Sequence, residues 1–238
     1  MGGAKIGLVE LPLALMNPGD LLLLPDPGYP DYLSGVSLGR VAYETFPLTA
    51  ENDFLPDLDA IPEETARRAK FIYINYPNNP TGAVATKAFY EKLVAWAKTY
   101  EVGVVSDLAY GALGYQGYEN PSFLSTPGAK DVGIEFYTFS KTFNMAGWRL
   151  AFAAGNDQMI EALNLIQDHL FVGIFPALQE AGIAALLDPK SEEAVAQLNA
   201  TYDSRRDAFV QAAAKIDWQA FPSRGSFYAW MPVPEGYT

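Results

Sequence analysis

The feature that most constrains the fold is a regular alternation between short apolar runs and longer segments with helical spacing. Parallel strands need a long crossover connection, usually a helix, whereas antiparallel strands can be joined by a tight turn. The alternation therefore favours an α/β fold in which helices flank a mostly parallel central sheet. The expected strands are residues 21–24, 41–46, 71–75, 102–106, 134–139 and 150–154.

Helical segments complete the alternation. In segment 87–100, Phe89, Leu93 and Trp96 fall on one face, and Thr86 is placed to cap its start. The one histidine of the chain, His169, falls within another helical pattern, and we expect it to be a structural residue. The expected helices are residues 4–16, 32–38, 63–70, 87–100, 157–171, 176–187 and 191–216.

The sequence also suggests a division into two domains. The long helix 191–216 has the character of a connecting rod, because the segment that follows it changes in composition. We predict a large domain over residues 1–200. Residues 201–238 would hold the end of the connecting helix and the beginning of an incomplete small α/β domain, with a further strand at 227–231.

The charge balance excludes several classes of partner. The 238 residues carry 16 basic and 28 acidic side chains, a net charge of −12, which suits neither nucleic acid nor an anionic membrane surface. Without cysteine, and with one histidine, we expect neither disulfides nor a metal site. No apolar run approaches membrane-spanning length, and no G-x-G-x-x-G follows a strand. The composition is compatible with a reducing cytoplasm.

Polar or aromatic side chains stand where four of the expected strands end. In an open α/β sheet, ligands bind beyond the carboxyl ends of the strands. If the strands are parallel, these side chains converge on one site, although each on its own also fits an ordinary turn or loop residue. The residues are Tyr29, Asn79, Asp107 and Lys141.

Lys141 has neighbours that suit a chemical task. It lies among hydroxyl side chains at a strand end, and Arg149 follows eight positions later. A desolvated lysine loses its proton readily, and the free amine can form a Schiff base with a carbonyl. Arg149 stays protonated, so it can hold a phosphate. The alternative is a surface lysine in a turn.

One cofactor requires this whole set of groups. Pyridoxal phosphate needs an amine for its aldehyde, a carboxylate for its pyridinium nitrogen, phosphate donors and a stacking ring. Asp107 would keep the ring nitrogen protonated, and Asn79 and Tyr110 would donate to the phenolic oxygen. The start of the helix after Gly2-Gly-Ala-Lys5 offers N–H groups for phosphate, and Tyr29 offers a ring. An ordinary chain terminus and a packed loop aromatic are the alternatives for these last two.

Three stretches have an order and spacing that can be compared with those of known families: Asn79-Pro-Thr-Gly82, Asp107-Leu-Ala-Tyr110 and Ser140-Lys-Thr-Phe-Asn-Met-Ala-Gly-Trp-Arg149. Two others, Asp26-Pro-Gly-Tyr-Pro-Asp-Tyr32 and Gly225-Ser-Phe-Tyr228, fit with them. Together they resemble the class I/II pyridoxal-phosphate-dependent aminotransferases of fold type I. Within that family the chain resembles most the branch of aspartate, diaminopimelate and N-acetyl-diaminopimelate aminotransferases.

The resemblance implies specific roles. Lys141 would carry the Schiff base and move the proton, Asp107 would pair with the pyridinium, and Tyr29 would stack on the ring. Asn79 and Tyr110 would contact the phenolate oxygen, and Lys141, Asp107 and Tyr110 would form the catalytic set. The residues implied to hold the phosphate are Ala4, Lys5, Thr138 and Arg149.

The resemblance also implies an activity, transamination between an L-amino acid and a 2-oxo acid, by a cytoplasmic homodimer. It leads us to expect further segments before Gly2 and beyond Thr238, including the arginine that grips the substrate carboxylate. Arg205, Arg206 and Arg224 do not match that arginine. The alternatives are another fold type I enzyme such as a carbon–sulfur lyase, a ligand-sensing domain, or a non-catalytic fragment.

Overall fold

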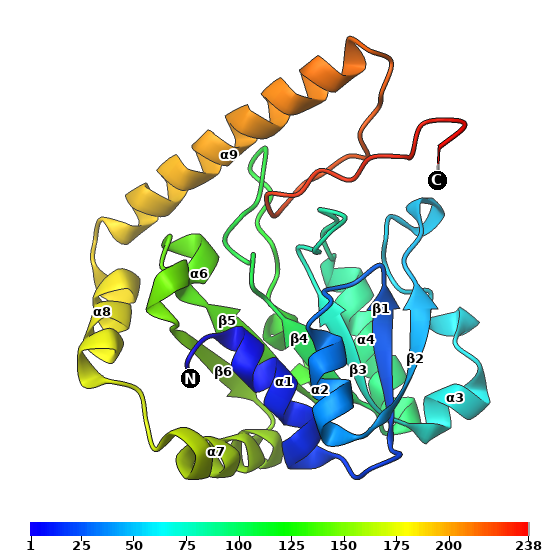
Figure 1. Ribbon diagram of the computed structural model, residues 1–238, viewed down its shortest axis with the longest axis vertical. Coiled ribbons are helices and arrows are strands. Elements are labelled where there is room, and N and C mark those ends of the chain that lie inside the picture. The colour runs from blue at the N-terminus through cyan, green and yellow to red at the C-terminus, as the bar shows by residue number, and fades with distance from the viewer. Residues whose placement is uncertain (238) are drawn as a thin grey trace.

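Six strands form one sheet in the order β2-β1-β3-β4-β5-β6. The computed structural model describes residues 1–237 (Figure 1). The first five strands in this order are parallel and β6 is antiparallel to β5. The prediction of a mostly parallel α/β sheet is therefore confirmed. The strands are β1 (Leu21–Asp26), β2 (Ala42–Pro47), β3 (Ala69–Asn75), β4 (Gly103–Asp107), β5 (Gly133–Thr138) and β6 (Ala151–Gly155).

Helices cover both faces of the sheet. Side chains of α1, α2 and α7 pack on one face, and those of α3, α4 and α5 pack on the other. Figure 1 shows α1 and α2 in front of the strands and α4 behind them. The helices are α1 (Ala4–Leu15), α2 (Tyr32–Gly39), α3 (Glu63–Arg68), α4 (Lys87–Tyr100), α5 (Ala129–Val132), α6 (Phe139–Thr142), α7 (Asp157–Phe171), α8 (Pro176–Leu187) and α9 (Ser191–Ala214).

Burial on both faces explains why the strands read as continuous apolar runs. Alternate side chains of a strand point to opposite faces. Leu21 and Leu23 accordingly join the core under α4, while Leu22 and Leu24 join the core under α1. All four are no more than 3% exposed. Neither face of such a strand is exposed to water, so polar side chains are found mainly where the strand ends.

Glu135 is an exception within β5, because it is charged and only 6% exposed. Its carboxylate accepts hydrogen bonds from the Ser106 hydroxyl at 2.9 Å, the Ser122 hydroxyl at 2.5 Å and the Phe123 backbone N–H at 2.8 Å. Burial raises the pKa of Glu135, and these donors oppose that rise. The carboxylate thereby ties the loop after β4 to the middle of the sheet.

The last part of the chain lies apart from the sheet. Helix α9 stands clear of the strands, and the segment after it returns beside the loop that follows β4 (Figure 1). The predicted domain boundary at residue 200 falls inside α9, and the division into two domains stays a prediction. Within residues 1–237, none of the helices combines the length and apolar character needed to cross a membrane.

Two details of the sequence prediction differ from the structure. The strand predicted at residues 227–231 is wrong, because the backbone there is irregular. Ser226 has a φ of 59°, outside the extended region, and a single antiparallel bridge between Gly114 and Gly225 replaces a strand ladder. The turn expected at Lys141 is the short helix α6, which Thr138 caps by accepting from the Ser140 N–H.

We predict that Glu135→Ala lowers the free energy of unfolding by about 3 kcal/mol, because three donors, two of them buried, lose their acceptor. Urea unfolding of the chain measures this change. Glu161→Ala is the matched control: Glu161 is an exposed residue of α7, and its loss should change stability by less than about 0.5 kcal/mol. Equal stabilities of the two variants would contradict the structural role of Glu135.

Candidate active site

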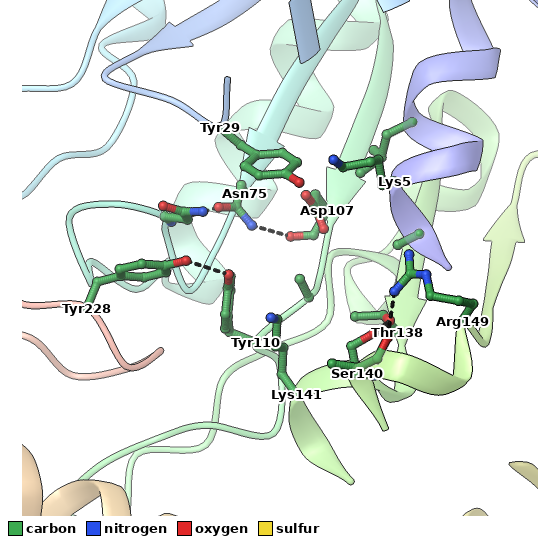
Figure 2. A pocket seen from close by; sticks show the side chains of 15 residues that line it. Lys5, Tyr29, Asn75, Asp107, Tyr110, Thr138, Ser140, Lys141, Arg149 and Tyr228 are labelled. Carbon is green, nitrogen blue, oxygen red and sulfur yellow. Dashed lines mark hydrogen bonds between the residues drawn. The ribbon is translucent and has the colours of Figure 1, made fainter. Parts of the chain in front are cut away.

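A cavity of about 630 Å³ opens at the carboxyl ends of the parallel strands and the start of α1. All nine residues predicted as site residues line it, although they come from six separate stretches of chain (Figure 2). Its lining consists of Ala4, Lys5, Leu8, Tyr29, Asn75, Asn79, Asp107, Ala109, Tyr110, Thr138, Ser140, Lys141, Ala146, Arg149 and Tyr228.

Asp107 lies at the inner end of the cavity as the last residue of β4, and it is 5% exposed. The Tyr32 hydroxyl donates to its Oδ2 at 2.9 Å. Its Oδ1 is buried and has no hydrogen-bond partner among the described residues. Burial raises the pKa of Asp107 to about 6. A buried carboxylate with a free oxygen is suited to accept a proton-bearing nitrogen or another cationic donor.

Lys141 lies on α6, on another side of the cavity from Asp107 (Figure 2). Its ammonium nitrogen is 5.3 Å from the centre of the Phe227 ring. Tyr110 and Tyr228 lie nearby, with their hydroxyl oxygens 3.2 Å apart. The lysine ammonium therefore lies over an aromatic ring, which attracts it through a cation–π contact.

The remaining end of the cavity suits an anion. Arg149 lies beside the first turn of α1, where Ala4 begins a 12-residue helix. Backbone N–H groups of a first helical turn have no partner within the helix, and they attract negative charge. Gly3 has a φ of 99°, and a Cβ there would lie 2.2 Å from Nη2 of Arg149. The absence of a side chain at Gly3 thus permits the guanidinium to approach the helix start.

Three other predicted residues have partners that the sequence did not reveal. The Lys5 ammonium pairs with Asp31 at 2.7 Å and lies 5.9 Å from the centre of the Tyr29 ring, so its charge is directed toward Asp31. The Thr138 hydroxyl donates to the Ser140 hydroxyl at 2.9 Å. Asn79 is fixed through its backbone N–H, which donates to the Asn75 side chain at 2.8 Å.

Sequence reasoning missed several residues of the site. The sequence motifs contain Tyr32 and Tyr228 but predict no role for them, and the pattern predicts Asn75 only as the end of a strand. The Asn75 amide donates to the backbone carbonyl of Asp107 at 2.8 Å. Tyr228 reaches the cavity from a segment far along the chain. The signal in the sequence was the presence of two tyrosines, Tyr29 and Tyr32, in the same short loop after a strand, which could have indicated that both lie at the site.

Comparison with known proteins decides the family. Residues 1–236 match the model of the family described as aminotransferase class I and II. The chain belongs to this aminotransferase family. It is 56% identical to L-glutamine–4-(methylsulfanyl)-2-oxobutanoate aminotransferase of Bacillus subtilis, over 99% of this chain and 59% of that protein. It is 48% identical to LL-diaminopimelate aminotransferase of Moorella thermoacetica, over 99% of this chain and 60% of that protein.

Solved structures of aminotransferases share the fold. The substrate-bound BacF structure from Bacillus subtilis superposes with a TM-score of 0.95 at 46% identity, over 100% of this chain and 60% of that chain. The relatives named here are all aminotransferases, as the resemblance of the motifs implied. The chain spans 59–60% of the length of these relatives.

We predict that Asp107→Asn makes the ligand-free chain more stable than its parent at pH 8. An unfolded aspartate titrates near pH 3.9, whereas the folded carboxyl titrates at about 6. The stability that the protonated carboxyl contributes is therefore full below about pH 4 and is lost as the pH rises through about 6. The gap, which is the free energy of unfolding of the variant minus that of the parent, should grow by about 3 kcal/mol from pH 4 to pH 8.

Urea unfolding at both pH values measures this gap. Asp168→Asn, at an exposed position of α7, is the matched control and should show no such growth. A gap for Asp107→Asn that stays constant between pH 4 and pH 8 would contradict the prediction.

Proposed function

We propose that the chain is the cofactor-binding part of a pyridoxal-phosphate-dependent transaminase. The observation that carries the proposal is a single cavity with three matching groups: an amine on Lys141, a buried free carboxylate oxygen on Asp107, and a cationic helix start at Arg149. When bound, pyridoxal phosphate supplies an aldehyde for amines and an electron sink for charge at the substrate α-carbon.

The residues present fit this cofactor. The unpartnered Oδ1 of Asp107 would accept from a protonated ring nitrogen, and the cation would compensate a buried carboxylate whose other oxygen accepts from Tyr32. Arg149 and the first N–H groups of α1 would hold the phosphate, with the Thr138 hydroxyl as a further donor. Lys5 would add positive charge to this end while it remains paired with Asp31.

The chain's own side chains have distinct tasks in the reaction. Lys141 would hold the aldehyde carbon at rest and, once released as a free amine, would carry the proton to and from the substrate α-carbon. Asn79 and Tyr110 would donate to the phenolic oxygen, and the Tyr29 ring would cover one face of the cofactor. The aromatic side chains around Lys141 would exclude water from the proton transfer.

We further propose that an L-amino acid and a 2-oxo acid are the substrates. The support comes from the named activities of the relatives, which use glutamine with 4-(methylsulfanyl)-2-oxobutanoate or LL-diaminopimelate. Within residues 1–237, Arg149 is the one arginine in the cavity lining, and the phosphate would occupy it.

A homodimer in the cytoplasm completes the proposal. Large apolar side chains are exposed around the end of α7 and along α8, including Val172 at 87%, Leu187 at 75% and Phe175 at 69%. Such a patch usually marks an interaction surface, and a second copy of the chain is the partner that the family resemblance implies. Sedimentation at increasing concentration tests it.

We predict that borohydride reduction of the chain with pyridoxal phosphate attaches the cofactor to Lys141. Peptide mapping by mass spectrometry locates the label, and Lys141→Ala should lose both the label and the visible absorption of the bound cofactor. Lys215, an exposed lysine just after α9, provides the control, since Lys215→Ala should label like the parent. A label elsewhere, or its persistence in Lys141→Ala, contradicts the proposal.

We predict that Arg149→Met weakens the binding of pyridoxal phosphate but not of pyridoxal, which lacks the phosphate. The loss of a charge-assisted contact of about 2 kcal/mol corresponds to about a thirtyfold weaker binding. Equilibrium titration of the visible absorption with both compounds measures the two affinities. An equal weakening for both compounds would show that Arg149 supports the cavity without binding the phosphate.

A further inference from the structure

Tyr110 and Tyr228 line one side of the cavity, and the Phe227 ring packs against both of them, so that the three rings form an aromatic wall. The Tyr110 ring forms T-shaped contacts with Phe227 and with Tyr228, with ring centres 5.2 Å and 5.7 Å apart, respectively. Lys141 points its ammonium nitrogen at the Phe227 ring. The wall thus touches the amine on which the proposed function depends. Phe227 and Tyr228 lie far from the other site residues in sequence, and Figure 2 shows Tyr228 reaching the cavity beside Tyr110.

Tyr115 fastens this distant segment to the loop that follows β4. Its hydroxyl donates to the backbone carbonyl of Ser226, and its backbone N–H donates to the carbonyl of Arg224 at 3.0 Å. In return the Ser226 N–H donates to the carbonyl of Leu113 at 3.2 Å. Tyr115 is 3% exposed and Ser226 is fully buried. The position of Phe227 and Tyr228 is therefore set by contacts behind the wall.

Arg206 of α9 covers Tyr115 from the other side. The centre of its guanidinium lies 4.7 Å from the centre of the Tyr115 ring, and its Nη1 donates to the Ser223 carbonyl at 3.4 Å. It pairs with Asp203 and, at 2.6 Å, with Asp207, and its side chain is 11% exposed. Two carboxylates already neutralise this arginine. Its geometry fits the fixing of a backbone segment better than the capture of a substrate anion.

We propose that Arg206 is a positioning residue that, through Tyr115, holds the aromatic wall against Lys141 and so sets the affinity of the site for the substrate amino acid. The inference rests on the proposed function. The substrate must enter beside Lys141, so a displaced Phe227 or Tyr228 changes the space it occupies. Of the groups proposed to contact the cofactor, Tyr110 belongs to the wall, whereas Arg149 and Asp107 lie outside this network, so cofactor affinity should change much less than amino-acid affinity.

Two variants of the 238-residue chain, Arg206→Met and Tyr115→Phe, test the proposal. Tyr115→Phe keeps the ring under Arg206 and removes only the bond to Ser226, which provides a test even if Arg206→Met fails to fold. With pyridoxal phosphate bound, we expect both variants to need about tenfold more amino acid for the change in visible absorption, with cofactor affinity altered less than about twofold. In the ligand-free chain, hydrogen exchange should accelerate over residues 222–228 and not in β4 or β5.

Lys215→Met is the matched control, because Lys215 is an exposed basic residue directly after α9. It should leave the amino-acid affinity and the exchange of residues 222–228 unchanged. Parent-like amino-acid affinity in both test variants overturns the inference and leaves the proposed function intact. A parent chain that binds no pyridoxal phosphate overturns the proposed function. If the parent shows no response to amino acid, hydrogen exchange decides, and unchanged exchange in both variants overturns the positioning role.

Discussion

The parallel register of the central strands determines the site. Asn75 pairs with Asp107 across β3 and β4, and Asp107 pairs with Phe136 across β4 and β5. The neighbouring strands therefore end at one level, and the chain leaves each of them at the same edge. Because the strands are buried on both faces, this edge is the first place where polar side chains can gather. A carboxylate, an amide and an amine become neighbours there although they are distant in sequence.

The candidate site contains a buried carboxylate, Asp107, whose hydrogen bonding is incomplete. Glu135 is buried too, but three donors satisfy its carboxylate. Asp107 has one hydroxyl donor and one oxygen left without a partner within the described chain. An unsatisfied buried charge lowers stability unless a ligand supplies the missing partner. The two carboxylates lie on adjacent strands, and the same burial supports the structure in one case and the proposed cofactor binding in the other.

The sequence could predict what depends on local patterns. Apolar runs locate the strands, and the residues that follow them, such as Asp107 and Lys141, locate the site. It could not predict contacts that depend on how distant elements pack. Lys5 pairs with Asp31 because α2 starts beside α1. Residues 227–231 do not form the predicted strand, because Phe227 and Tyr228 pack on Tyr110. Aromatic, β-prone composition indicated a strand there, and tertiary packing overrode it.

The large sequence separation between the residues of the aromatic wall has a consequence for folding during synthesis. Tyr110 and Tyr228 are 118 positions apart, whereas most neighbouring strands of the sheet are also neighbours in the chain. During synthesis the strands can assemble as they leave the ribosome, but the cavity keeps an open side until the segment beyond α9 arrives. A nascent chain that ends at α8 already holds Asp107 and Lys141, so the groups proposed to bind the cofactor are exposed before their enclosure is complete.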